Sequence, residues 1–320
     1  MRHLRNDKTV KQNKHPTYFY PDLGCRILDL GFVRIDGHGL GNSFFNYFHA
    51  VALSIKHSGI MITPAWFSIK IGTFLRRETS KRLYWRMFKP FPEELCRFSK
   101  ILILTKMFKQ RNYINISGNG DINVLEGTLN VVGCPSYAFT FNGLHNYRDV
   151  IRTRLLSIVN DPIPTNHSWG GNDFIAVHVR LGDFTETPDA KQICSGDKNV
   201  RIPLSWYVNV AKALQSHYPS MPIRIFSDGK KNELEPLLKL GATLYRSGSD
   251  ITDLLVMSSA SILVGSRSTY SQWAVFLGDM PSIWIKTTIK DEKPSAPHTP
   301  ILYIPIDATP SGIPALEYWE

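Results

Sequence analysis

The chain has 320 residues, 43% of them hydrophobic and 20% charged, which is the composition of a globular protein and argues against disorder. This length leaves room for two ordinary domains, each with its own core. The formal net charge of +10 favours an anionic partner but does not separate nucleic acid, anionic lipid and nucleotide diphosphate.

The first part of the chain predicts a strand, a glycine turn and a helix. Residues 26–35 have strand character, and three glycines lie close together in the stretch Gly37–Gly41. Apolar residues then recur at helical spacing over 44–55, with Asn42 placed as the N-cap. A second strand at 60–63 would complete a βαβ unit.

The glycine turn does not match a dinucleotide-binding motif. Asn42 stands where the last glycine of that motif belongs, and the first acidic residue after Asp36 is Glu78. The motif needs an acidic residue about 20 positions on, so a hydride-transfer enzyme is disfavoured. What the glycines do allow is close approach of the backbone to another domain or to a ligand.

Residues 64–145 mix helical and strand signals. Much of the positive charge lies between Lys70 and Lys109, where basic residues alternate with aromatic ones, as in Lys81–Lys89. Three interpretations stay open: a solvated helix face over an apolar core, side chains that stack on nucleic-acid bases, and a membrane-contact surface.

From residue 174 onward, strands and helices alternate, which predicts a parallel sheet covered on both faces. The predicted strands are 174–179, 223–226, 242–245, 261–264 and 282–285, and the predicted helices are 205–217, 232–240, 250–259 and 269–277. A linker rich in Pro, Gly and polar residues at 161–171 precedes them. We therefore predict an α/β protein with two domains, residues 1–164 and 165–320.

Three polar loops follow strands of the second domain: Arg180–Asp183, Ser227–Gly229 and Ser266–Ser271. Open α/β sheets bind ligands at the carboxyl ends of their strands. The planar guanidinium of Arg180 suits a pyrophosphate, and a helix N-terminus after the third loop would add an anion site, although a Ser/Thr run there also serves as a simple cap. The chain contains no HExxH, GxSxG or Walker A motif and no Asp-x-Asp pair.

Three blocks of the sequence resemble the α-1,2-fucosyltransferases of the glycosyltransferase family 11 type. His178–Phe184 resembles their His-x-Arg-x-Gly-Asp-aromatic motif, which α-1,6- and O-fucosyltransferases share more loosely. The run Gly39–Asn42 resembles their N-terminal signature. Asp253–Ser258 together with Ser268–Trp273 resembles their third block.

The resemblance implies a GT-B-like architecture, in which two Rossmann-like domains face each other across a cleft. It implies GDP-fucose as the donor, inversion at the anomeric carbon, and neither a metal nor another cofactor. The first domain would bind the acceptor, an oligosaccharide or lipid-linked glycan, with α-1,2 transfer to a galactoside of a surface polysaccharide. The second domain would bind the GDP-sugar.

The resemblance also assigns roles to individual residues. Arg180 would hold the β-phosphate, while His178 and Asp253 would contact guanine. Ser268 and Thr269 would bind phosphate from the helix N-terminus. Three further residues complete the predicted donor-binding set, two of them from the first domain: Asn42, Gly41 and Asp228.

The chain departs from the family pattern at three positions. Leu181 stands where many relatives have a second arginine, Ser43 replaces a glutamine, and Arg267 replaces an asparagine. These departures bear on the identity of the sugar and of the acceptor more than on the GDP site. Another GDP-deoxysugar would fit the same pocket.

Two residues are candidates for the base that inversion requires. Asp183 is the carboxylate of the motif, but beside Arg180 it is a weak base and suits an ion pair or a positioning role equally well. His38 lies in the glycine turn, and an imidazole ordinarily titrates near neutrality. A histidine in a turn is also commonly a polar surface residue.

Two further functions from other classes remain open: a non-catalytic GDP-sugar or glycan-binding protein, and a nucleic-acid-binding protein, the second of which the motifs disfavour. No apolar run approaches the roughly 20 residues that cross a bilayer, and no signal-peptide core is present. We therefore expect a cytoplasmic protein, with peripheral contact at the inner face of the membrane as an alternative. Four scattered cysteines predict free thiols.

Overall fold

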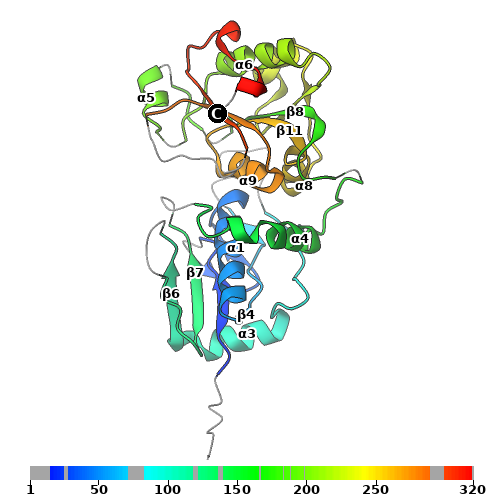
Figure 1. Ribbon diagram of the computed structural model, residues 1–320. Helices are drawn as coiled ribbons and strands as arrows, with labels where there is room; N and C mark the ends of the chain where they lie inside the picture. Colours follow the sequence, from blue (N-terminus) through cyan, green and yellow to red (C-terminus); the bar gives the residue numbers. More distant parts are fainter. Residues whose placement is uncertain are drawn as a thin grey trace, which may run out of the picture.

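The protein consists of two α/β domains, each built on a parallel sheet, and the domains lie end to end in Figure 1. This computed structural model describes residues 15–24, 28–70, 83–117, 122–135, 140–165, 167–182, 184–187, 189–197, 199–288 and 299–318. Two α/β domains with parallel sheets confirm the predicted fold class, a GT-B-like pair of Rossmann-like domains. The boundary at residue 164 stays a prediction. No helix in the described ranges is long and apolar enough to cross a membrane.

The first domain contains a four-stranded parallel sheet in the order β4-β1-β7-β6 and a three-stranded sheet in the order β2-β3-β5. Its strands are β1 (Tyr18–Pro21), β2 (Leu28–Asp29), β3 (Arg34–Ile35), β4 (Ile60–Met61), β5 (Ser68–Ile69), β6 (Arg111–Asn115) and β7 (Leu129–Gly133). Its helices and 3₁₀ turns are α1 (Leu40–Lys56), α3 (Arg97–Lys106), η1 (Phe108–Gln110), η2 (His145–Tyr147) and α4 (Arg148–Ile158).

Two predictions about this domain are wrong. The single strand expected at 26–35 is, in its described part, a pair of short antiparallel strands, because the chain turns at Gly31, whose φ is +84°. The strand of the βαβ unit is instead β1, which pairs in parallel with β4. Helix α1 begins at Leu40 with Gly39 as its N-cap, so Asn42 lies inside the first turn rather than at the cap.

The second domain contains a six-stranded parallel sheet in the order β10-β9-β8-β11-β12-β13. Its strands are β8 (Asn172–Val179), β9 (Ile223–Ser227), β10 (Thr243–Leu244), β11 (Ala260–Val264), β12 (Ser282–Ile285) and β13 (Ile301–Ile304). Its helices and 3₁₀ turns are α5 (Ala190–Cys194), α6 (Leu204–His217), η3 (Lys231–Leu234), α7 (Glu235–Leu238), α8 (Asp250–Met257), α9 (Thr269–Gly278), η4 (Pro310–Gly312) and η5 (Leu316–Tyr318).

The strand order makes β8 the switch point of this sheet. The chain leaves β8 toward β9 and β10 on one side and then crosses to β11 on the other, which is the order of a dinucleotide-binding Rossmann sheet. The predicted alternation of strands and helices is confirmed, while β13 and α5 were missed. The crevice at the carboxyl ends of β8 and β11 is therefore the expected ligand position.

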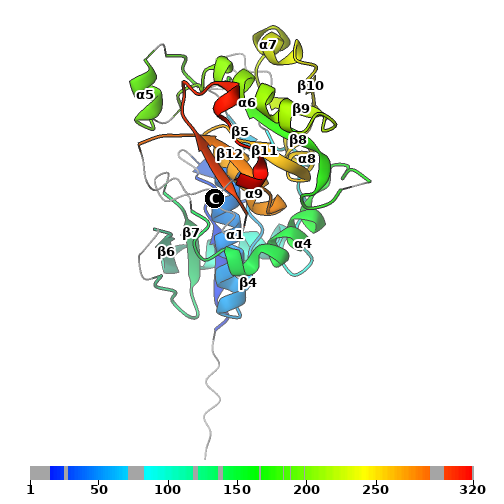
Figure 2. The same cartoon turned by 45° about the horizontal axis from the view of Figure 1, so that its top comes forward.

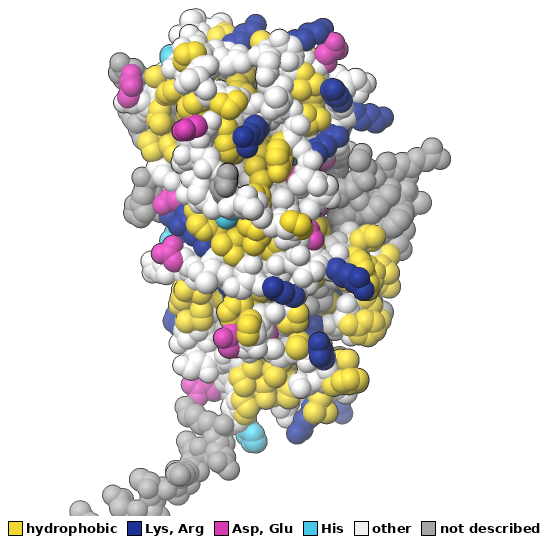
Figure 3. All heavy atoms as spheres, turned by 90° about the vertical axis from the view of Figure 1, so that its right-hand side faces the viewer, with side chains coloured by type: hydrophobic (Ala, Val, Ile, Leu, Met, Phe, Trp, Pro, Cys, Tyr) yellow, Lys and Arg dark blue, Asp and Glu magenta, His cyan; other side chains and the backbone are white. Residues whose placement is uncertain are grey.

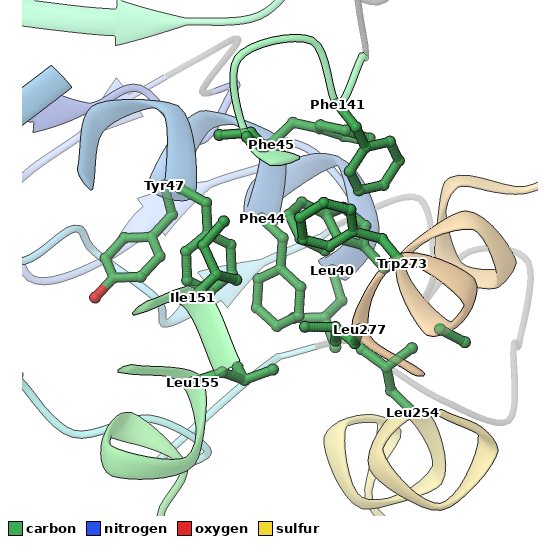
Figure 4. Packing of buried hydrophobic residues seen from close by; sticks show 14 of the residues in the cluster. Leu40, Phe44, Phe45, Tyr47, Phe141, Ile151, Leu155, Leu254, Trp273 and Leu277 are labelled. Carbon is green, nitrogen blue, oxygen red and sulfur yellow. The ribbon is translucent and has the colours of Figure 1, made fainter. Parts of the chain in front are cut away.

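The two domains share one apolar core. Figure 4 shows Trp273 of α9 among aromatic side chains of α1 and the loop before α4. The Trp273 ring lies 5.6 Å from Phe44, 5.0 Å from Phe45 and 4.8 Å from Phe141, measured between ring centres. In Figure 2, α9 lies between α1 and the strands of the six-stranded sheet. The helix that follows β11 is thus fixed from both sides.

Candidate functional site

Three polar loops meet at the carboxyl ends of β8, β9 and β11. Arg180 directly follows β8, Asp228 directly follows β9, and the loop 265–268 joins β11 to α9. Because β8 lies between β9 and β11, the parallel register brings all three loops to one edge of the sheet. The predicted loops are therefore neighbours in space.

Arg180 forms an ion pair at this edge. Its Nη1 lies 2.7 Å from Oδ2 of Asp228, and the two side chains are 21% and 20% exposed. The other carboxylate oxygen of Asp228 accepts a hydrogen bond of 2.8 Å from the backbone N–H of Leu181. Asp228 thus orients both the guanidinium and the loop after β8, and the partial exposure leaves the guanidinium within reach of an anion.

Gly182 provides the space for this carboxylate. A Cβ atom at Gly182 would lie 2.5 Å from Oδ2 of Asp228, closer than unbonded atoms pack. We expect Gly182→Ala to displace Asp228 and to lower the free energy of unfolding by about 1–3 kcal/mol. Denaturant unfolding measures this loss.

The matched control is Gly312→Ala, since a Cβ there would lie 3.7 Å from the nearest atom, Oγ1 of Thr309. Equal stability of the two variants would show that the contact between residue 182 and Asp228 does not constrain this loop.

His178 is buried beneath the loop after β11, where serine hydroxyls surround it. Its Nδ1 lies 2.6 Å from Oγ of Ser271 and 2.8 Å from Oγ of Ser266. Burial, followed by the charge of Arg180, lowers the pKa of His178 from 6.5 to about 3. The imidazole is therefore neutral near pH 7 and acts as a hydrogen-bonding partner that fixes the serine loop.

This burial predicts a pH dependence of stability. Between about pH 6.5 and 3 the unfolded state binds a proton at His178 and the folded state does not, so the free energy of unfolding falls as the pH falls through this window. We expect His178→Asn to flatten that decline in urea unfolding curves. His49 is the matched comparison, because burial lowers its pKa to about 4 and its contribution has the same sign. A wild-type slope in His178→Asn would contradict the assignment.

The N-terminus of α9 contacts the N-terminus of α1 across the domain interface. Oγ1 of Thr269 donates a hydrogen bond of 2.5 Å to Oδ1 of Asn42, and Nε1 of Trp273 donates one of 2.7 Å to the carbonyl of Gly41. A Cβ at Gly41 would lie 2.8 Å from Oγ1 of Thr269. The prediction that this glycine turn allows close approach to another domain is confirmed at Gly41. Ser268 is the N-cap of α9.

The remaining predicted residues lie in different surroundings. Asp253 on α8 accepts hydrogen bonds of 2.8 and 2.7 Å from the N–H and hydroxyl of Ser247, and burial raises its pKa. The ring of His38 packs against Gly24, and its carbonyl accepts a hydrogen bond of 2.6 Å from Nζ of Lys70. Asp183 lies outside the described residues. The choice of a base between His38 and Asp183 thus stays a prediction.

Three residues at this edge were missed as site residues. Ser266 and Ser271 are buried and hold His178, although only Ser268 and Thr269 were selected from their loop. Arg246 donates hydrogen bonds to the carbonyls of Ser227 and Gly229, which brings a second guanidinium to the loop after β9. The sequence shows several serines in this loop, but only the fold shows that the hydroxyls of Ser266 and Ser271 lie against His178. Among the described residues, His, Cys, Asp and Glu form no cluster of three or more that could hold a metal ion.

The first domain contains an aromatic pocket of about 250 Å³. Trp85 and Phe32 in its lining are 60% and 67% exposed. Burial, followed by the charges of Asp250 and Asp253, raises the pKa of Tyr270 in the second domain. Tyr84 adds to this rise, so it lies close to the second domain. The pocket is lined by Phe32, Thr63, Pro64, Trp66, Phe67, Tyr84, Trp85, Arg86, Phe88 and Pro90.

No protein-family model and no curated protein matches the chain. The fucosyltransferase NodZ from Bradyrhizobium is 10% identical and similar over 81% of this chain and 92% of its own, with a TM-score of 0.42. POFUT1 in complex with GDP-fucose is 11% identical over 84% of this chain and 98% of its own, with a TM-score of 0.43. A mutant of Arabidopsis thaliana FUT1 in complex with GDP is 10% identical over 87% of this chain and 73% of its own, with a TM-score of 0.44. Similarity at this level carries no conclusion about substrate.

Proposed function

We propose that the protein is an inverting glycosyltransferase that transfers fucose from GDP-fucose to a saccharide acceptor. The observation that carries the proposal is Arg180, partly exposed at the switch point of a six-stranded parallel sheet, directly after β8 and one strand away from β11, which leads into α9. The same residue is the arginine of the motif that resembles fucosyltransferases. The departures at Leu181 and Arg267 leave open a variant of this proposal in which the donor is another GDP-deoxysugar.

The chemistry follows from where negative charge develops. As the bond between the sugar and the β-phosphate breaks, the departing GDP gains charge, and Arg180 with the N–H groups at the start of α9 would stabilise it. His178 stays neutral and fixes the loop that precedes α9. A base on the acceptor side, His38 or Asp183, would take the proton of the attacking hydroxyl.

The aromatic pocket of the first domain is our candidate acceptor site. Pyranose rings have apolar C–H faces that pack on aromatic side chains, and binding pockets combine such surfaces with few polar groups. Trp85 offers an exposed ring, and the Arg86 guanidinium lies 5.6 Å from its centre. This arrangement suits one saccharide unit of an oligosaccharide or lipid-linked glycan.

The direct test is turnover of GDP-fucose with a panel of β-galactoside and O-antigen acceptors. We expect release of GDP, an α-1,2 linkage with inverted anomeric configuration, and activity that persists in EDTA. GDP should also raise the melting temperature. Stabilisation by GDP without donor turnover would instead support a non-catalytic GDP-sugar-binding protein. Stabilisation by RNA and not by GDP would overturn both proposals.

A further inference from the structure

Helix α3 exposes apolar side chains on its outer face. Phe98, Ile101 and Leu102 occupy positions i, i+3 and i+4 and are 88%, 43% and 65% exposed. Phe108, in the 3₁₀ turn that follows, is 64% exposed. The inner face of the helix is apolar as well, since Ile103 and Leu104 pack on the core of the first sheet. The outer residues are therefore not needed to attach α3 to the domain.

Basic residues surround this outer face. Arg97, Lys106 and Lys109 are exposed, and the Arg111 guanidinium lies 4.4 Å from the centre of the Phe108 ring. The sequence from 95 to 120 contains no Asp or Glu. Figure 3 shows hydrophobic and basic side chains side by side at the end of the molecule where the first domain lies. Apolar groups that insert, with cations around them, are the pattern of an interfacial helix.

We propose that α3 and η1 bind the surface of an anionic phospholipid bilayer. The four aromatic and aliphatic side chains would enter the interface, and each lysine or arginine near the surface would add about 1 kcal/mol of attraction. Lysine is depleted in interfaces between proteins, so the exposed Lys106 and Lys109 favour a lipid surface over a second protein. The sequence between Lys70 and Lys109, where basic residues alternate with aromatic ones, left a membrane-contact surface open as one interpretation. Our proposal locates that surface on α3 and η1.

The position of α3 fits this role. In Figure 1 the helix lies at the end of the first domain that points away from the second domain. Bound through α3, the protein would hold the edge near Arg180 away from the bilayer and toward the water. This inference does not depend on the proposed function.

Flotation of the full chain with vesicles tests the proposal. The wild-type protein should float with vesicles of phosphatidylglycerol and phosphatidylcholine, should float less at high salt, and should remain at the bottom with phosphatidylcholine alone. The double variant Phe98→Asp, Leu102→Asp should reduce the bound fraction about tenfold or more. Val150→Asp, at an exposed apolar position of α4 that is 42% exposed, is the matched control and should float like the wild type.

Each other outcome overturns the proposal. Equal flotation of the wild type and the double variant would assign lipid binding to another surface. A wild-type dimer that the double variant converts to a monomer, without flotation, would show that a second copy covers α3. Thermal stabilisation by GDP, measured on every variant, reports whether the donor site and the fold are intact, so a failure of the donor proposal would be seen separately.

Discussion

Arg180→Ala is expected to lower the rate of GDP release from GDP-fucose by about 10²–10³-fold, which corresponds to about 2.7–4 kcal/mol of lost transition-state stabilisation. The guanidinium is the partly exposed cation directly after β8, and its removal also leaves the carboxylate of Asp228 without this partner. That remaining negative charge would oppose a diphosphate at the same edge. Steady-state turnover at saturating acceptor, together with calorimetry of GDP binding, measures the two effects.

Two comparison variants sharpen this result. Arg180→Lys keeps the charge but loses the planar fork that matches phosphate oxygens, so we expect an intermediate rate. Arg224→Ala removes the same charge from the adjacent strand β9, where the guanidinium lies 4.2 Å from the centre of the Phe174 ring, and should retain turnover within a few-fold of wild type. Turnover of Arg180→Ala within a few-fold of wild type would remove this residue from the mechanism.

Trp273→Ala is expected to lower the free energy of unfolding by about 3–5 kcal/mol and to uncouple the two domains. The side chain is fully buried, contacts four aromatic rings from the first domain and donates a hydrogen bond to the carbonyl of Gly41. Its loss leaves a cavity at the place where α9 and α1 meet. Calorimetric unfolding should show two separated transitions, and the segment 161–171 should become accessible to protease.

Trp206→Ala is the matched control for this prediction. Trp206 on α6 is equally buried, but it belongs to the separate core cluster of the second domain. We expect a similar loss of stability with no new cleavage between the domains. If protease cleaves the segment 161–171 no faster in Trp273→Ala than in the control, other contacts hold the domains together.

The sequence predicts the second domain well because its strands and helices each carry a clear period. Strand β8 has eight residues and contains the apolar run Phe174–Val177, and α6 and α9 begin and end near turn signals. The first domain is built from shorter pieces: four of its seven described strands, β2, β3, β4 and β5, have only two residues each. Such strands leave no period to detect, and β1 was missed for a related reason, since it has four residues and directly follows a basic, polar stretch.

The same limit applies to the candidate site. Arg180 and the serine loop were predicted because polar residues follow apolar strands, which is a local signal. The pairs formed by Arg180 with Asp228 and by Asn42 with Thr269 join residues 48 and 227 positions apart, so only the packing of the sheet and of the two domains brings them together. Gly182 and Gly41 belong to sequence motifs, but the sequence does not show why a glycine is needed at either position. The fold shows that a Cβ atom at each position would touch a neighbouring side chain.

A crystal structure of the protein soaked with GDP tests the central claim most directly. We expect the diphosphate at the carboxyl ends of β8 and β11, with its oxygens within about 3 Å of the guanidinium of Arg180 and of the first N–H groups of α9. A diphosphate bound at any other edge of the protein, with the Arg180 to Asp228 pair untouched, would contradict the account.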